Sequence, residues 1–199
     1  MQASGPYQKR SGGTEPVSRE ILLHICCCPC ATAVLDELRQ DGYEVTGFFH
    51  NPSIHPWKEL QRRLDALKEW ASVKELPVIY STDYHPESNL RMLMEADNRC
   101  MACFSERMTA TAFQARALGI QSFTTTLTIS PYQNQKMILK AGLAAEELTE
   151  VKYLHRDFSK LYRKSITLSR EAGMYRQPYC GCIFSERDRY MKITSPGQL

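Results

Sequence analysis

The sequence predicts an α/β protein in which a parallel sheet is flanked by helices. Short apolar runs rich in β-branched and aromatic residues alternate with segments whose apolar residues recur every three or four positions. Strands and helices that alternate in this way form a parallel sheet with helices on both faces. The length of 199 residues and the hydrophobic content of 43% suit one domain with a single core.

The first half of the chain contains two predicted strands, each followed by a predicted helix. Residues 20–25 form a short apolar run, and residues 31–40 form a helix whose apolar face ends before Gly42. Residues 43–49 carry the β-branched and aromatic side chains typical of a second strand. A proline then precedes a helix predicted over residues 57–74.

The second half continues the alternation. Residues 77–80 are a third predicted strand, residues 104–118 are a helix that Gly119 ends, and residues 120–126 are a fourth strand. The remaining predicted elements are two helices and a short strand: 131–141, 158–173 and 151–154. We therefore expect a Rossmann-like (HUP-like) parallel sheet flanked by helices, with a helical C-terminal part that carries a Cys-x-Cys loop.

The N-terminal end differs in composition from the rest of the chain. Residues 1–18 contain three glycines and two prolines and lack the apolar stretch of a secretion signal, which predicts a disordered tail. Residues 19–199 are expected to form a single α/β domain. No apolar run approaches the roughly 18 to 20 residues that span a bilayer. These features predict a cytoplasmic protein with no membrane partner.

Basic residues cluster toward the C-terminal end, although the net charge of +3 is too small to indicate a partner by itself. The segment 152–170 contains six lysines and arginines and one acid, Asp157. A phosphate backbone could lie along such a surface. The alternative is an ordinary solvated helix face.

Eight cysteines are the most informative feature of the composition. Because no export signal is present and the cytosol keeps thiols reduced, structural disulfides are not expected. Metal binding or redox chemistry is therefore the expected role of the cysteines. The cysteines form three clusters: Cys26, Cys27, Cys28 and Cys30; Cys100 and Cys103; Cys180 and Cys182.

The first cluster lies at a predicted strand-to-helix turn and contains a C-x-x-C spacing from Cys27 to Cys30. The peptide dipoles and free amides at a helix N-terminus stabilise thiolates, which makes a cysteine there a better ligand or nucleophile. Inert packing is the alternative, but it gives no reason for four cysteines within five positions.

The other two clusters extend the set of possible ligands. Cys100 and Cys103 also have C-x-x-C spacing, and with the first cluster they supply the thiolates that a tetrahedral zinc or a cubane iron–sulfur cluster requires. Cys180 and Cys182 flank one glycine. Such a pair can form a strained, easily reduced disulfide or point both sulfurs at a metal, so it indicates an electron relay or a second metal site.

The number of candidate ligands favours redox chemistry over a structural zinc. A structural zinc needs four protein ligands, whereas this chain offers eight cysteines together with His24, His50 and His55. The loops that carry many of these residues follow predicted strands, and ligands of open parallel sheets collect at the carboxyl ends of strands. A thioredoxin-like thiol–disulfide oxidoreductase, or a metal-binding module without its own substrate, is the alternative.

Five segments of the chain, spread between Leu22 and Tyr190, resemble the epoxyqueuosine reductases of the QueH type. They are LLHICCCPC (22–30), NPSIHP (51–56), CMACF (100–104), FTTTLTISPYQ (123–133) and YRQPYCGCIFS (175–185). The resemblance implies two-electron removal of the epoxide oxygen from epoxyqueuosine at the wobble position of tRNA, the last step of queuosine biosynthesis. The substrate partner would be the anticodon loop of tRNA, and the external electron donor is not indicated.

The resemblance also implies a division of labour among the cysteines of a single iron–sulfur catalytic domain. Cys26, Cys27, Cys100 and Cys103 would hold a 4Fe-4S cluster, and Cys180 and Cys182 would be a redox-active pair. An additional mononuclear iron is also implied, with Cys30 as a candidate ligand. Two positions depart from the family pattern: Cys28 replaces a small residue, and Ser53 stands where asparagine is common.

Further residues are candidates for handling protons and the substrate. Three side chains could donate a proton: His55, Asp157 and Tyr179. Aromatic residues could stack on an unstacked base of the anticodon loop, with core packing as the alternative: Phe49, Tyr132 and Tyr175. The run Thr124–Thr126, ahead of a helix expected to begin near Pro131, offers hydroxyls and a helix N-terminus for a phosphate.

Overall fold

The computed structural model describes residues 19–191 of the chain. The predicted N-terminal tail, residues 1–18, lies outside the described residues, as does the stretch 192–199 of the predicted domain. None of the helices in the described part combines the length and the apolar character that a bilayer span requires.

Five parallel strands form one sheet in the order β3-β2-β1-β4-β5, with β1 at the centre. Their bounds are β1 (Glu20–His24), β2 (Glu44–His50), β3 (Val78–Ser81), β4 (Ser122–Thr125) and β5 (Lys152–Tyr153). Leu22 of β1 is in register with Thr46 on one side and Phe123 on the other. This order confirms the predicted Rossmann-like parallel sheet and places the switch point between β1 and β4. The narrower HUP-like assignment is compatible with the sheet and stays a prediction.

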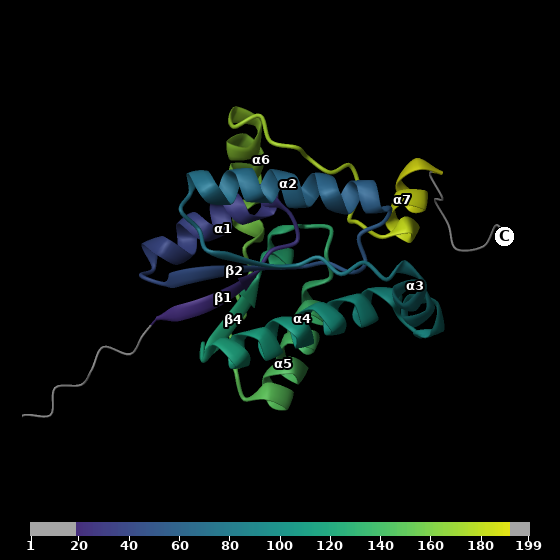
Figure 1. The fold of residues 1–199 in the computed structure, drawn as a ribbon, viewed down its shortest axis with the longest axis horizontal. Coiled ribbons are helices and arrows are strands. Elements are labelled where there is room, and N and C mark those ends of the chain that lie inside the picture. The colour runs from purple at the N-terminus through teal and green to yellow at the C-terminus, as the bar shows by residue number, and fades with distance from the viewer. Residues whose placement is uncertain (1–18, 192–199) are drawn as a thin grey trace, which may run out of the picture.

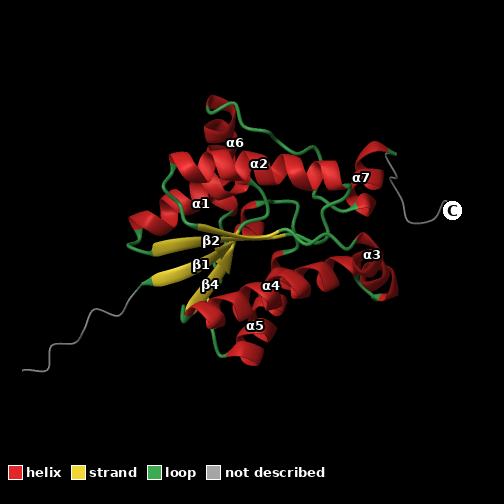
Figure 2. Cartoon of the chain, in the orientation of Figure 1, coloured by secondary structure: helices red, strands yellow, loops and turns green. Residues whose placement is uncertain are grey.

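Helices cover both faces of this sheet (Figure 1, Figure 2). One face carries α1 (Cys28–Gln40), α2 (Trp57–Val73) and α6 (Tyr162–Glu171), and the other carries α4 (Arg99–Leu118) and α5 (Gln135–Thr149). Two shorter helices lie beyond the carboxyl ends of the strands: α3 (Pro86–Glu95) and α7 (Ile183–Tyr190). Two 3-10 turns complete the chain: η1 (Thr126–Ile129) and η2 (Ser159–Leu161).

The central strand β1 is buried on both faces and separates two hydrophobic cores. Ile21 and Leu23 pack against α1 and α2, whereas Leu22 packs against α4 and α5. This division follows from the period of two in a strand, because successive side chains point to opposite faces. The same alternation continues past the strand, so Ile25 belongs to the first core and Cys26 to the second.

Three predicted helix boundaries were displaced. α1 begins at Cys28 and α4 at Arg99, so cysteines of the first two clusters lie in first turns rather than ahead of the helices. Asn98 caps α4, because its side chain accepts a hydrogen bond from the backbone three residues on. Asn134 caps α5 in the same way, and α5 therefore begins at Gln135 and not near residue 131.

The sequence did not predict α3 or α7. α3 has apolar residues at helical spacing but is only ten residues long and buries only Asn89 and Leu93, whereas α7 buries no residue and has no apolar stripe. The helix predicted over residues 158–173 is divided into η2 and α6. These differences concern mostly the end of the sheet where the cysteine-bearing loops gather.

Candidate functional site

Three cysteine sulfurs converge where β1 passes into α1. The ligand atoms of Cys26, Cys27 and Cys30 all lie within 4.8 Å of one another, and the sulfurs of Cys26 and Cys27 are 3.8 Å apart. Cys27 is the N-cap of α1 and Cys30 lies in its first turn. Thiolates around one tetrahedral ion, at bond lengths of about 2.3 Å, lie about 3.8 Å from each other. This thiol group could therefore bind a metal ion.

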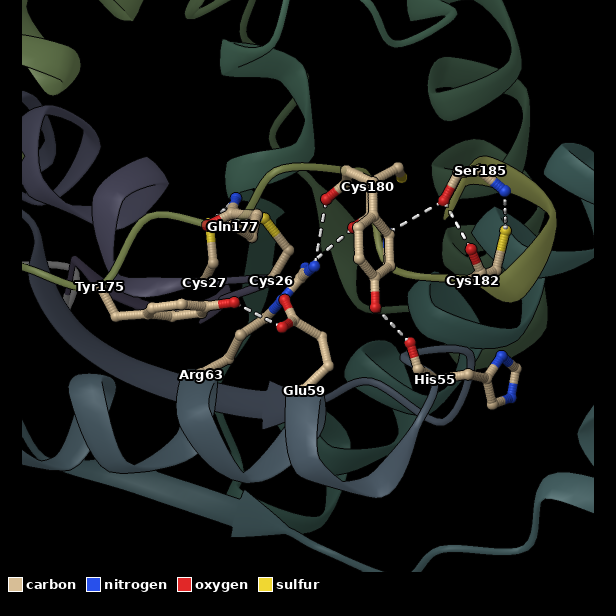
Figure 3. Close-up of polar contacts among 12 residues, drawn as sticks. Cys26, Cys27, His55, Glu59, Arg63, Tyr175, Gln177, Cys180, Cys182 and Ser185 are labelled. Atoms are coloured by element: carbon tan, nitrogen blue, oxygen red, sulfur yellow. Dashed lines mark hydrogen bonds and ion pairs between the residues drawn. The ribbon is translucent and has the colours of Figure 1, made fainter. Parts of the chain in front are cut away.

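Side chains from distant segments contact these sulfurs. The Thr126 hydroxyl on η1 lies 3.3 Å from the Cys26 sulfur and also accepts a hydrogen bond from the Cys26 backbone at 3.1 Å. The amide Nε2 of Gln177 lies 2.8 Å from the Cys27 sulfur, and Figure 3 shows the two side chains together. Hydrogen bonds donated to sulfur favour its thiolate form. Gln177 was not singled out from the sequence, because one glutamine in a loop has no distinguishing pattern.

The three thiols differ in how easily they lose a proton. Hydrogen bonds from Cys27 and Cys30, acting against burial, hold the pKa of Cys26 well below its usual value. The contact with the Cys26 sulfur, together with burial, raises the pKa values of both Cys27 and Cys30. The thiolate expected at the start of α1 is therefore that of Cys26. The thiols of Cys27 and Cys30 stabilise its negative charge by donating hydrogen bonds to it.

Cys28 lies on the opposite side of α1 from this thiol group. Its sulfur contacts the Met174 sulfur at 3.3 Å, and the residue is 1% exposed within the core that includes Ile54. Burial raises the pKa of Cys28 to about 12. Its packing accounts for a cysteine at this position, and its thiol is not one of the three that converge.

The second cysteine pair lies at the start of α4, with Cys100 in the first turn and Cys103 in the second, and it is near the third pair. Cys100 is exposed, and Cys103 is partly buried. Burial is the main cause that raises the pKa of both thiols, and the nearby thiols of Cys180 and Cys182 add to the increase. Among the described residues, Cys100 and Cys103 are not part of the group of sulfurs within 4.8 Å.

The third pair lies on a loop that a buried arginine anchors to α2 (Figure 3). Arg63 donates from Nη1 to the Cys180 carbonyl oxygen at 2.8 Å and from Nη2 to the Tyr179 carbonyl oxygen at 3.1 Å. Its Nε also forms an ion pair with Glu59 at 2.8 Å. The two bonds to carbonyl oxygens fix the backbone of the Cys-x-Cys loop, and the ion pair with Glu59 holds Arg63 in place, so the position of Cys180 depends on the interior of α2.

The residue between the two cysteines must be a glycine. Gly181 has a φ of +153°, and a Cβ added there would lie 3.0 Å from the Ile54 side chain. The Gly181 carbonyl oxygen accepts a hydrogen bond from the His55 backbone at 2.9 Å. Cys182 then caps α7, with its sulfur 3.4 Å from the Ser185 amide nitrogen. The short distance between Gly181 and Ile54 places the Cys-x-Cys loop in contact with the loop 51–56.

A cavity of about 560 Å³ connects the first and third cysteine clusters. Its wall includes thiols from both clusters: Cys26, Cys30 and Cys180. Tyr132 and Tyr162 also line it, with ring centroids 6.1 Å apart in an edge-to-face arrangement, and Tyr132 is 84% exposed. Gln133 extends its amide Nε2 to 3.1 Å from the Cys180 sulfur. The cavity thus combines reactive thiols, aromatic rings and hydrogen-bond donors in one space.

A family model described as "Epoxyqueuosine reductase QueH" matches residues 21–188 of the chain. The chain belongs to the QueH family. The epoxyqueuosine reductase QueH of Dehalococcoides mccartyi is 32% identical over 178 residues, which are 89% of this chain and 98% of that protein. Proteins of the same name from Thermotoga maritima and Streptococcus pyogenes are 36% and 34% identical. They align with 86% and 87% of this chain and with 93% and 72% of their own lengths, respectively.

Two of the histidines considered as additional metal ligands in this QueH chain, His24 and His50, form hydrogen bonds within the protein instead. His24 places Nδ1 2.9 Å from the Thr125 hydroxyl and Nε2 3.1 Å from the His50 carbonyl oxygen. Burial lowers the pKa of His24 to about 3, so its ring is neutral. His50 contacts Ser81 at 2.9 Å through Nδ1 and Glu106 at 2.6 Å through Nε2. Neither histidine has a free ring nitrogen for a metal in this arrangement.

His55 and Tyr179 lie beside the Cys-x-Cys loop. His55 is 4% exposed, and within residues 19–191 neither ring nitrogen has a hydrogen-bond partner. Figure 3 shows its ring directed away from Cys26 and Cys27, and it lines a second cavity of about 630 Å³. The Tyr179 hydroxyl donates to the His55 carbonyl oxygen at 2.6 Å, and burial raises its pKa to about 12. Tyr179 therefore fixes the loop through a neutral hydroxyl.

The structure does not bring Asp157 to the thiols. Its carboxylate accepts a hydrogen bond from the Ser159 backbone at 2.9 Å at the start of η2, and the residue is exposed. That hydrogen bond lowers the pKa of Asp157, which keeps the carboxylate ionised. Asp157 is not among the described residues that line either cavity.

The three candidate aromatic platforms have different environments. Phe49 is 0% exposed in the core beside α1 and α2, so the expectation that a base stacks on it was wrong. Tyr132 is accessible at the thiol cavity. Tyr175 lines the second cavity, and its hydroxyl donates a hydrogen bond to the Glu59 carboxylate at 2.5 Å. Tyr162, which the sequence reasoning did not consider as a platform, lies beside Tyr132.

The expectation of a phosphate site at Thr124–Thr126 was also wrong. All three residues are buried, and their hydroxyls contact the Leu154 carbonyl oxygen, His24 and Cys26. The helix expected near Pro131 begins at Gln135. The hydroxyls of Thr124–Thr126 therefore form hydrogen bonds that stabilise the segment around His24 and Cys26.

The basic segment 152–170 is only partly free for a phosphate backbone. Lys152 forms an ion pair with Glu146, and Arg156 forms one with Asp41. Four other basic residues are exposed on η2 and α6: Lys160, Arg163, Lys164 and Arg170. Arg163 directly follows Tyr162, which lines the thiol cavity, so one end of this smaller surface lies near the cavity.

Proposed function

We propose that this QueH-family chain is an epoxyqueuosine reductase that acts on the wobble nucleotide of a tRNA anticodon and yields queuosine. In this reaction two C–O bonds of the epoxide break, a C=C bond forms, and the oxygen leaves as water after the uptake of two electrons and two protons. The observation that carries the proposal is the cavity shared by Cys26, Cys30 and Cys180 in a chain of this family. It offers thiols from two clusters to one substrate.

Four cysteines are proposed to hold a 4Fe-4S cluster: Cys26, Cys27, Cys100 and Cys103. A bound cluster would supply electrons one at a time. Two features support this assignment: the sulfurs at the end of β1 converge, and the first two turns of α4 carry two further thiols. Cys30 is the candidate ligand of an additional mononuclear iron, since its sulfur belongs to the converged group.

Cys180 and Cys182 are proposed to act as a redox-active pair. Oxidation of two thiols to a disulfide releases two electrons and two protons, which balances the loss of one oxygen atom as water. Cys180 reaches the cavity, and the Gln133 amide donates a hydrogen bond to its sulfur. An external reductant must restore the two thiols after each turnover.

The substrate base is proposed to leave its stack and enter the cavity between Tyr132 and the thiols. Unstacking is inexpensive in a single-stranded loop, and stacking on an aromatic side chain compensates for it. The exposed basic residues of η2 and α6 would contact the tRNA backbone. Of the two proposed proton donors, His55 is favoured because its ring nitrogens have no hydrogen-bond partner among residues 19–191, whereas Asp157 is held ionised and lines neither cavity. The cytoplasmic location predicted from the sequence stays part of this proposal.

A paired assay distinguishes the reductase from a thiol–disulfide oxidoreductase without a tRNA substrate. Protein prepared without oxygen and supplied with iron, sulfide and a chemical reductant is incubated with tRNA that carries epoxyqueuosine, and in parallel with a protein disulfide. The proposal predicts queuosine in the digested tRNA, and loss of that product in Cys27→Ser. Reduction of the protein disulfide together with unchanged epoxyqueuosine would support the alternative.

A further inference from the structure

Arg107 is a buried arginine on α4, one helical turn beyond Cys103. It is 2% exposed. Its helix neighbours Phe104 and Met108 pack in the core that also contains Cys26. Because residues four positions apart lie on the same face of a helix, Arg107 and Cys103 face the same region. A full positive charge is thus placed in the hydrophobic layer beneath the thiols.

No carboxylate of residues 19–191 forms an ion pair with Arg107. Its Nε is buried without a hydrogen-bond partner in the described part of the chain. The adjacent Glu106 instead contacts His50 at 2.6 Å. Arg63, which is equally buried, differs in having an ion pair with Glu59 and two backbone carbonyl partners. The two buried arginines therefore have different roles: Arg63 holds a loop, and Arg107 has no such structural partner.

Thiols from all three cysteine clusters lie close enough to Arg107 to act on its charge. Burial acts to lower the pKa of Arg107, but Cys103, Cys180 and Cys26 raise it, and the net shift is upward. The side chain therefore stays charged. Glu106 adds a smaller effect, and one of its carboxylate oxygens is already engaged by His50.

A buried cation without a negative partner is strongly destabilising, so an anionic group is expected beside it in the working protein. Cysteines that bind a metal do so as thiolates, and four thiolates carry more negative charge than one divalent ion neutralises. We call the four proposed cluster ligands, Cys26, Cys27, Cys100 and Cys103, the thiol centre. When charged, this centre would supply the negative partner that Arg107 lacks among the described residues. Without the cation, the same centre would place uncompensated negative charge in the core.

We propose that Arg107 is the buried counter-charge of the thiol centre, a positioning residue that stabilises the negative charge carried by the cysteines when metal and electrons are present. The inference rests on the proposed function and deepens it. A cation at this place favours the more negative, reduced state of the centre and so raises its reduction potential. It also favours the thiolate form that binds metal.

The test compares Arg107→Gln, Arg107→Lys and a control, Arg116→Gln, which makes the same change at an exposed position of α4. Cobalt(II) is titrated into the reduced, full-length, metal-free protein, and the thiolate–cobalt absorption gives the affinity. The midpoint potential of the iron-loaded protein is measured in parallel. Arg107→Gln should weaken cobalt binding by about tenfold or more and lower the midpoint potential. Arg107→Lys should retain most of both values, and Arg116→Gln should match the parent.

Parental cobalt affinity and midpoint potential in Arg107→Gln would overturn the proposal. A second variant, Arg107→Met, covers the case in which the glutamine variant does not fold. If Arg107 only balances the thiol centre, metal-free Arg107→Met is at least as stable to urea as the parent, because an unpaired charge has been removed. A marked loss of that stability would show that Arg107 supports the fold itself, and would also overturn the proposal. Cobalt binding does not depend on tRNA, so failure of the parent to reduce epoxyqueuosine would count against the proposed function alone.

Discussion

The Nη1 atom of Arg63 donates a hydrogen bond to the Cys180 carbonyl oxygen across 2.8 Å, although the two residues are 117 positions apart in the chain. Through this contact the interior of α2 sets the position of the Cys-x-Cys loop. The loop also contains Gly181, and any residue with a Cβ at this position would come within about 3.0 Å of the Ile54 side chain. The geometry of the proposed redox pair is therefore determined by residues that carry out no chemistry.

Replacement of Arg63 should release this loop and destabilise the protein. Arg63→Met leaves Glu59 buried without its cation, which should lower the free energy of unfolding by about 3–5 kcal/mol. Urea unfolding followed by circular dichroism measures the change. The adjacent Arg62 is exposed, and Arg62→Met should stay within about 0.5 kcal/mol of the parent. Equal effects of the two substitutions would contradict the anchoring role of Arg63.

Two neighbouring cysteines should respond in opposite ways to serine substitution. Cys27→Ser removes a sulfur of the converged group and should abolish most of the iron binding, measured by iron and acid-labile sulfide analysis after anaerobic reconstitution. Cys28→Ser removes a thiol that packs against Met174, so the iron content should be retained while stability falls by about 1 kcal/mol or more. Loss of iron in Cys28→Ser with retention in Cys27→Ser would contradict the assignment of the thiol group.

Removal of the Tyr132 ring should weaken RNA binding without changing the metal content. Stacking of a base on an aromatic side chain contributes about 1–3 kcal/mol, so Tyr132→Ala should raise the Kd for an anticodon stem-loop by roughly tenfold. Fluorescence anisotropy with a labelled stem-loop measures this affinity. Tyr190 is also exposed but lines the second cavity, and Tyr190→Ala serves as the matched control. A Kd that is unchanged in Tyr132→Ala would remove this ring from the substrate surface.

The buried His55 should make the fold less stable in acid. Burial, and then the nearby Arg107, lower the pKa of His55, so the folded protein keeps the ring neutral while the unfolded chain takes up a proton below about pH 6.5. Stability is therefore present above that pH and is lost as the pH falls toward the depressed value, at a rate of up to about 1.4 kcal/mol per pH unit.

Urea unfolding of the metal-free protein at pH 7.5 and pH 5.5 measures this pH dependence. His55→Gln should have a smaller loss between the two pH values than the parent, although the buried His24 still contributes. The exposed His155 provides the control, since His155→Gln should keep the parental difference. An identical pH dependence in His55→Gln and the parent would contradict the neutral, buried state of His55.

The sheet and the residues directly following its central strand could be predicted from the sequence because their signals are local. The apolar run that becomes β1 is continuous, and the cysteines after it stand within five positions. α7 could not be predicted, since it buries no residue and has no apolar period. The sequence left Phe49 between base stacking and core packing, because an aromatic residue in a strand has the same sequence signal whether it faces a cavity or the core; the structure shows core packing.

The supporting contacts of the site depend on tertiary structure and leave no local pattern. Gln177 reaches Cys27 across 150 positions, and Arg63 is one of several charged residues on an amphipathic helix until its partners are known. Arg107 likewise is one of several charged residues of α4, and only its burial distinguishes it. By contrast, Asn98 stands three residues ahead of the backbone amide that it caps, and that signal could have been found in the sequence.

A single-turnover measurement tests most directly whether the thiol cavity performs the reduction. Iron-loaded protein is fully reduced, freed of external reductant under anaerobic conditions, and mixed with tRNA that carries epoxyqueuosine; nucleosides are then quantified by mass spectrometry. Because Cys180 and Cys182 together hold two electrons and two protons, the account predicts about one queuosine per chain, accompanied by oxidation of this pair. Epoxyqueuosine that remains unchanged in the presence of fully iron-loaded, reduced protein would contradict it.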